Sequence, residues 1–257
     1  MRILVLGGTT EASALARRLA GDARFSLTLS LAGRTAAPQS HPVATRIGGF
    51  GGADGLARWV RAHGIAAIVD ATHPFAARIS ANAVEAAQLC GIPIASVVRA
   101  PWQPREGDDW ICVDGFDEAA SAIGENPRRV LLTIGRQEVA AFRAAPQHLY
   151  IVRTIDPPAA EDLPPRVEVI HRRGPFGLDG EIALMRAHGI DCVISKNAGG
   201  EATYAKIAAA RELGLPVIMI SRPHKPARLA LDSVDAVCAW LERQRNAHCG
   251  PRSDRGV

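Results

Sequence analysis

Glycines and hydroxyl side chains gather where the first short apolar run of the sequence ends, and these residue types can bind phosphate. Gly7-Gly8-Thr9-Thr10-Glu11 follows the apolar residues 2–6 and opens a stretch with helical spacing. At such a turn the backbone N–H groups and the helix dipole attract phosphate, and Thr9 and Thr10 add hydroxyl donors. Ala12 stands where the last glycine of a G-x-G-x-x-G fingerprint is sought. The motif therefore favours a nucleotide, but it also fits a tight turn without a ligand.

A basic residue follows the second apolar run, where dinucleotide-binding folds contact the adenosine ribose. There Arg34 offers a guanidinium to a 2′-phosphate and Thr35 offers a hydroxyl, whereas an acidic residue would favour NAD. This favours NADP, unless Arg34 is only a solvated surface charge. The glycine-rich residues 48–52 either bring the backbone close to the cofactor, with Gly49 in contact, or form a flexible loop.

The fourth apolar run ends in Asp70-Ala71-Thr72-His73-Pro74-Phe75. An imidazole exchanges protons near neutral pH, so His73 is a candidate proton donor or carboxylate ligand, although a lone histidine is more often structural. Asp70 commonly caps a turn in such a position. We assign Asp70 and Thr72 to the cofactor site and His73 to the substrate site.

Polar residues also follow a strand-like run in the second half of the chain. Ser195-Lys196-Asn197-Ala198-Gly199-Gly200 precedes Thr203-Tyr204 and Lys206. Lys196 and Tyr204 are candidate proton donors or substrate anchors, and Gly199, Gly200 and Lys206 are candidate substrate contacts. Tyr204 and Lys206 diverge on a helix, unlike the Tyr-x-x-x-Lys pair of short-chain reductases. A glycine-rich loop capped by Asn197, with solvated lysines, is the alternative.

Further basic residues stand at predicted strand ends. Arg136, Arg222 and Lys225, together with Arg153 and Arg172-Arg173, would form a positive rim for a polyanionic ligand. Taken singly, each fits a surface charge or a member of an ion pair.

Apolar runs and helical patterns alternate along the chain, which predicts α/β architecture with parallel sheets covered on both faces. Prolines, glycine and charges at residues 100–110 indicate a crossing between domains. We expect an NADP-binding Rossmann-like domain over residues 1–100, a Rossmann-like substrate domain over 101–245, a cleft between them and a flexible tail over 246–257. The expected strands are residues 2–6, 26–31, 44–47, 66–70, 94–98, 130–133, 149–152, 167–170, 192–195 and 217–220.

An internal repeat links the two halves, because Arg-Ala-His-Gly-Ile occurs at residues 61–65 and again at 186–190. Each copy precedes a strand, a polar loop, a helix and then Gly-Ile-Pro-Ile or Gly-Leu-Pro-Val. One explanation of the likeness is that helix caps and buried strands of α/β proteins favour the same residue types. The alternative is that one α/β half was duplicated.

The composition excludes several classes of protein. The 257 residues carry a net charge of +4, with 47% hydrophobic and 22% charged residues, and the apolar runs have the length of strands. These values exclude a membrane span and wholesale disorder, and they show no excess of basic residues typical of nucleic-acid binding. The five cysteines lack C-x-x-C spacing, so no metal site is expected. No secretory signal is readable, which makes the cytoplasm the expected location.

Five blocks of the sequence together resemble the precorrin-6A reductases of cobalamin biosynthesis. The blocks are Ile3 to Ala12, Asp70-Ala71-Thr72-His73-Pro74-Phe75-Ala76, Leu132-Thr133-Ile134-Gly135-Arg136, Ser195 to Lys206, and Val217-Ile218-Met219-Ile220-Ser221-Arg222-Pro223. They occur in order over about nine-tenths of the chain. The Asp-Ala-Thr-His-Pro-Phe-Ala and Lys-Asn-Ala-Gly-Gly blocks are the distinctive ones.

The resemblance implies reduction of one double bond in precorrin-6A to give precorrin-6B, with NADPH as hydride donor and without metal or flavin. It implies a tetrapyrrole ligand and no nucleic acid or membrane partner. It is also compatible with transient contacts to neighbouring enzymes of the pathway. The proton comes from His73, Tyr204, Lys196 or water. The alternatives are a reductase of cobalt-precorrin-6A and a non-catalytic NADP sensor. Arg34 disfavours a third, a methyltransferase that uses S-adenosylmethionine.

Overall fold

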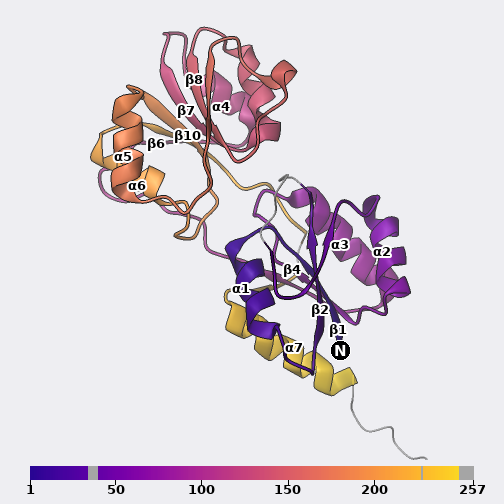
Figure 1. Ribbon diagram of the computed structural model, residues 1–257. Coiled ribbons are helices and arrows are strands. Elements are labelled where there is room, and N and C mark those ends of the chain that lie inside the picture. Colours follow the sequence, from indigo (N-terminus) through magenta and orange to yellow (C-terminus); the bar gives the residue numbers. More distant parts are fainter. Residues whose placement is uncertain (34–39, 227, 249–257) are drawn as a thin grey trace, which may run out of the picture. The chain divides into compact units, whose positions relative to one another are not determined.

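The computed structural model describes residues 1–33, 40–226 and 228–248, and it contains two compact α/β units (Figure 1). Unit 1 comprises Met1–Arg99 and the chain from His224 onward, whereas unit 2 comprises Ala100–Pro223. The chain therefore crosses from one unit to the other twice. Arg34 and Thr35 lie outside the described residues.

Unit 1 contains a six-stranded parallel sheet in the order β12-β5-β4-β1-β2-β3, which is the strand order of a Rossmann fold. Its strands are β1 (Arg2–Leu6), β2 (Ser26–Leu31), β3 (Ala44–Ile47), β4 (Ala67–Asp70), β5 (Ile94–Val97) and β12 (Leu229–Leu231). Its helices are α1 (Thr10–Leu19), α2 (Gly52–Ala62), α3 (Ala77–Cys90) and α7 (Val234–His248).

Unit 2 repeats this order with β6-β11-β10-β7-β8-β9, again with all strands parallel. Its strands are β6 (Trp110–Val113), β7 (Arg129–Thr133), β8 (Leu149–Thr154), β9 (Val167–His171), β10 (Cys192–Lys196) and β11 (Val217–Ile220). The α-helices are α4 (Phe116–Ala122), α5 (Leu178–Ala187) and α6 (Ala205–Glu212), and the 3-10 helices are η1 (Arg136–Ala144) and η2 (Ala160–Asp162). The predicted α/β class with two Rossmann-like halves is confirmed.

The core of unit 1 follows from the apolar sequence of β1, whose side chains alternate between the two faces of the sheet. Ile3 and Val5 pack in one cluster with α1 and α7, and Leu4 and Leu6 pack in another with α2 and α3. All four side chains are almost fully buried. A central parallel strand must be apolar on both faces because helices cover both, so this run had a clear signature.

The structure supports duplication of one α/β half. The two copies of Arg-Ala-His-Gly-Ile span corresponding places, from α2 toward β4 and from α5 toward β10. The two units also exchange their sixth strands. β6 follows the first five strands of unit 1 but pairs with β11 in unit 2, and β12 follows the strands of unit 2 but pairs with β5 in unit 1.

This exchange corrects the predicted domain limits. The first limit, at residue 100, agrees with the structure within one residue, but residues 224–245 belong to unit 1 and not to the second domain. β12 has only three residues, and pairing with the distant β5 defines it, so no local pattern marks it. Helix α7 continues to His248, beyond the predicted start of the tail, and residues 249–257 lie outside the described part.

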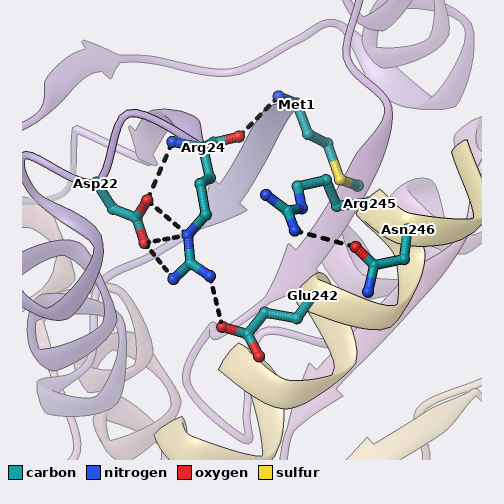
Figure 2. Close-up of polar contacts among 6 residues, drawn as sticks. All are labelled: Met1, Asp22, Arg24, Glu242, Arg245 and Asn246. Carbon is teal, nitrogen blue, oxygen red and sulfur yellow. Dashed lines mark hydrogen bonds and ion pairs between the residues drawn. The ribbon is translucent and has the colours of Figure 1, made fainter. Parts of the chain in front are cut away.

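Helix α7 contributes both core and surface contacts to unit 1. Val237 and Leu241 are fully buried against the α1 side of the sheet. At the surface, Arg24 binds Asp22 at 2.7 Å and reaches Glu242 of α7 at 3.1 Å (Figure 2). The two Arg24 contacts are exposed, so most of the free energy of docking comes from the apolar face.

We expect L241A to lower the free energy of unfolding by about 2–4 kcal/mol, because truncation leaves a cavity in the core of unit 1. Urea denaturation followed by circular dichroism measures this change. The control is L89A on α3, where the leucine is 47% exposed and its truncation should cost little. Equal effects of the two variants would contradict the placement of α7.

Candidate functional site

In each unit the polar turns that the sequence singled out follow the two central strands of the sheet. These strands are β1 and β4 in unit 1 and β7 and β10 in unit 2. In an open α/β sheet this is the topological switch point, and ligands bind outside the carboxyl ends of the strands there. Each unit therefore has its own candidate site.

Two glycines shape the turn after β1, one by packing and one by its backbone conformation. A Cβ at Gly7 would lie 2.6 Å from Leu29 Cδ1, and Gly8 has a φ of +116°, which favours glycine. Thr9 Oγ1 accepts from Ala12 N–H at 3.2 Å, which caps α1, and donates to Ala71 O at 2.8 Å. This hydroxyl thus joins the turns after β1 and β4, a role that differs from the predicted donation to phosphate.

Glu11 brings a cation to the N-terminus of α1. Its carboxylate oxygens accept from Arg99 Nη1 at 2.9 and 3.0 Å, and Thr10 Oγ1 lies 3.1 Å from Oε2. Burial alone would raise the pKa of Glu11, but its own backbone N–H and Arg99 outweigh burial and lower that pKa. The ionised Glu11 therefore orients Arg99, a residue that the sequence analysis missed.

The turn after β4 is organised by a buried carboxylate. Asp70 is 1% exposed, and its Oδ1 accepts from Thr72 N–H at 3.1 Å and from Thr72 Oγ1 at 2.6 Å. Its Oδ2 accepts from Arg228 at 2.8 Å. Lys225 donates to Thr72 Oγ1 at 3.3 Å and to His73 O at 3.0 Å. Protein groups therefore bind both oxygens of Asp70, and Lys225 belongs to this turn in unit 1.

The ring of His73 has a defined hydrogen bond within the same turn. Its Nδ1 accepts from Phe75 N–H at 3.2 Å. In the neutral ring the proton is then on Nε2, because a nitrogen that accepts a hydrogen bond carries no hydrogen. His73 can therefore present an N–H donor from Nε2.

Arg46 on β3 holds the glycine-rich loop that contains Gly49. Its guanidinium donates to Ser30 Oγ at 2.8 Å and to the carbonyl oxygens of Gly48 and Gly49 at 3.0 Å each. It also lies over the ring of Phe50, 3.7 Å from the centroid. The loop is thus fixed by one side chain, which the sequence analysis did not identify because it lies inside a strand.

In unit 2 the loop after β10 is held by an amide pair and an arginine. Asn197 Oδ1 accepts from Trp102 N–H at 2.8 Å, and Asn197 Nδ2 donates to Trp102 O at 3.0 Å. Trp102 Nε1 donates to Gly200 O at 2.8 Å. Arg222 donates to Asn197 O at 2.9 Å and to Ala198 O at 3.0 Å. Arg222 therefore shapes the loop that carries Gly199.

The end of β10 and the turn after β7 each add a cation to the same switch point. Lys196 Nζ lies 3.5 Å from Glu138 Oε1, and both side chains are partly exposed. Gly135 has a φ of +104°, and a Cβ there would lie 3.1 Å from Glu138 Oε2. Arg136 is half-buried, and its side chain makes no hydrogen bond or ion pair with the residues that the structure describes. Arg136 and Lys196 are therefore the unit 2 cations best suited to an anionic ligand.

Tyr204 and Lys206 both contact Trp102, and their polar atoms bind different partners. The Tyr204 hydroxyl accepts from Arg211 at 2.6 Å, and its ring lies 5.7 Å from that of Trp102. Lys206 is 4% exposed, donates to Thr203 O at 2.8 Å and lies 5.0 Å from the Trp102 ring. Burial lowers the pKa of Lys206 to about 7, Arg153 adds to this effect, and Glu181 opposes it.

The expected positive rim is corrected at one residue. Arg153 is buried, paired with Glu181 and stacked on Phe176, so it is not part of a positive rim. The described residues contain no group of three metal-binding side chains of the His, Cys, Asp or Glu types. None of the described helices combines the length and the apolar character needed to cross a bilayer.

Comparisons with known proteins agree with this arrangement. A family model described as Precorrin-6x reductase CbiJ/CobK matches residues 2–242. A precorrin-6A reductase from Sinorhizobium sp. is 53% identical over 93% of this chain and 94% of its own. A cobalt-precorrin-6A reductase from Priestia megaterium is 32% identical over 86% and 90%. A solved structure of CobK precorrin-6A reductase matches all of both chains, with a TM-score of 0.90 and 46% identity.

We expect G199A to destabilise unit 2 by about 3 kcal/mol, because a Cβ there adds overlap to the strain of a positive φ. That Cβ would lie 2.2 Å from Ala100 O and 2.4 Å from Arg222 Nη2. The control is G214A, whose φ is also positive but whose Cβ would meet nothing within 4 Å. It should cost about 1 kcal/mol. Urea denaturation compares the free energies of unfolding of the two variants. Equal losses would refute the close approach of Gly199 to Ala100 and Arg222.

We expect the stability of the wild type to rise with pH relative to K206M. Above about pH 7 the folded Lys206 is neutral, whereas the unfolded lysine stays protonated up to its ordinary pKa of about 10.4. The unfolded state then binds more protons than the folded state. The free energy of unfolding of the wild type should therefore rise by about 2 kcal/mol relative to that of K206M between about pH 7 and pH 9. Urea denaturation at several pH values tests this, and parallel profiles would contradict it.

Proposed function

This chain belongs to the precorrin-6x reductase CbiJ/CobK family, and we propose that it uses NADPH to reduce one double bond of precorrin-6A, giving precorrin-6B in cobalamin biosynthesis. The observation that carries the proposal is that each unit has polar turns at its switch point, but of different chemistry. The turn after β1 in unit 1 suits a phosphate, and the Arg136 and Lys196 side chains of unit 2 suit carboxylates.

The residues of unit 1 fit a dinucleotide. Gly8 leaves space for the backbone to approach a diphosphate, because a Cβ there would meet nothing within 4 Å, and the first turn of α1 provides N–H groups and a favourable dipole. Arg99 adds a positive charge beside that turn. After β2, Arg34 supports a preference for NADPH by its place in the sequence. When bound, the nicotinamide supplies the hydride for the double bond.

The residues of unit 2 fit a tetrapyrrole with acidic side chains. Arg136 can bind a carboxylate through two parallel hydrogen bonds, and Lys196 can contribute a point charge. Arg222 and Trp102 hold the loop that carries Gly199 and Gly200 in place. In this proposal Lys206 supports the loop from inside the unit.

The chain's main contribution to catalysis is the positioning of the reactants, which can remove several kcal/mol from the barrier. His73 is our first choice for the proton donor, because an imidazole exchanges protons near neutral pH and the bond from Phe75 N–H to Nδ1 directs that exchange through Nε2. Lys196 is the second, since its ammonium lies at the switch point of unit 2. The Tyr204 hydroxyl accepts a short bond from Arg211, so we place this residue in support of the loop.

Precorrin-6A is favoured over the cobalt-containing substrate, because identity is 53% to the precorrin-6A reductase against 32% to the cobalt-precorrin-6A reductase. An anaerobic titration with NADPH and either pigment separates the two. We expect the NADPH absorbance and the precorrin-6A spectrum to change together. Reduction of the pigment should be faster with NADPH as donor than with NADH. Binding of NADPH without reduction of either pigment would leave a non-catalytic sensor as the better account.

We expect R136M to raise the KM for precorrin-6A about tenfold, because one charge-assisted contact to a carboxylate is lost. The dissociation constant of NADPH should stay unchanged, since unit 1 binds it. The control is R143M, an exposed arginine on the same 3-10 helix η1. Steady-state kinetics with both variants measure the effect, and an unchanged KM in R136M would remove Arg136 from the substrate site.

A further inference from the structure

A single buried guanidinium fastens the residues before β12 to the carboxyl ends of β4 and β5. Arg228 Nη2 donates to Asp70 Oδ2 at 2.8 Å, and the two side chains are only 7% and 1% exposed. Arg228 Nε donates to Ser96 Oγ on β5, and Nη1 donates to Pro226 O at 2.9 Å. Arg228 thus joins two strands of unit 1 to the segment that returns from unit 2.

The same carboxylate continues this network toward the ligand end of the sheet. Asp70 accepts from Arg228 with one oxygen and from Thr72 with the other. Thr72 Oγ1 in turn lies 3.3 Å from Lys225 Nζ, which also donates to His73 O. A buried carboxylate is costly unless it is paired and hydrogen-bonded, so Arg228 is the group that allows Asp70 to order this turn.

The place of this network in the sheet points to one part of a dinucleotide. A Rossmann sheet consists of two mononucleotide-binding halves on either side of the switch point. In unit 1 the phosphate turn follows β1, and β1, β2 and β3 form one half of the sheet, which assigns the adenosine half of the cofactor to that side. β4, β5 and β12 then face the nicotinamide half, and Lys225 lies at the carboxyl end of β4 on this side.

We propose that Arg228 and Asp70 are positioning residues, which act through Lys225 to shape the binding site for the nicotinamide mononucleotide half of the cofactor. This inference rests on the proposed function, because it takes a nicotinamide dinucleotide as the ligand. It assigns the Lys225 ammonium to the cofactor and not to the tetrapyrrole. The last segment of the chain thereby completes a site that begins with Gly7.

The test is a double-mutant cycle on the dissociation constant of NADPH, measured on the full chain by calorimetry. We expect R228M and K225M each to weaken binding about tenfold, since each removes the same ordered ammonium contact. The double variant should be no weaker than K225M alone, because residues that act through one another are not additive. R228K should recover part of the loss, since it restores a positive charge opposite Asp70.

The control is R24M, which removes an arginine from an exposed ion-pair cluster in the same unit (Figure 2). NADPH affinity should not change in this variant. Thermal melting separates stability from positioning, because R228M should melt earlier whereas K225M should melt as the wild type does. If R228M does not fold, R228K takes its place in the cycle.

Unchanged NADPH affinity in R228M or K225M would overturn the inference, and so would a double variant about a hundredfold weaker than the wild type. The second result would mean that the two residues act independently. Failure of the proposed function has a different signature, namely a wild type that binds NADPH but leaves precorrin-6A unreduced. Failure of the inference appears as an active wild type whose affinity for NADPH does not depend on Arg228.

Discussion

Parallel pairing of the strands is the constraint on which both candidate sites depend. Within each sheet all strands run in one direction, so their carboxyl ends meet at one edge. Helices must cover both faces of such a sheet, and the central strands are therefore largely apolar, with polar residues mainly at their ends. Polar chemistry is left to the turns at the strand ends. In unit 1 a hydrogen bond from Thr9 Oγ1 to Ala71 O joins the turns after β1 and β4.

The two units hold these turns by different physical means. Unit 1 uses charge, with Glu11 paired to Arg99 and Asp70 paired to Arg228. Unit 2 combines neutral hydrogen bonds, in which the Asn197 amide binds both backbone groups of Trp102, with donation from the Arg222 guanidinium to two carbonyl oxygens of the loop. A buried ion pair fixes the orientation of both side chains. Removing one partner is strongly destabilising, because it leaves the other charge buried and uncompensated. Neutral amide bonds are weaker singly, so in unit 2 they fix the loop together with the bonds from Arg222.

The fold was largely predictable from the sequence, and the site only in part. Runs such as residues 2–6 have the apolar signature of a central parallel strand, so their positions were predicted well. β12 was missed because its three residues form a strand only through β5. The location of Asp70 and Thr72 at a strand end was predictable from local pattern. Their link to Arg228 was not, because it joins positions 158 residues apart.

The exchange of sixth strands has a consequence for the order in which the protein can fold as it leaves the ribosome. Unit 2 is complete once Pro223 has been made, whereas unit 1 still lacks β12 and α7 at that moment. Until those residues emerge, β5 has an unpaired edge, and the core face that receives Val237 and Leu241 stays open to water. Domains usually mature in the order of synthesis. Here the unit that is begun first is the one that is finished last.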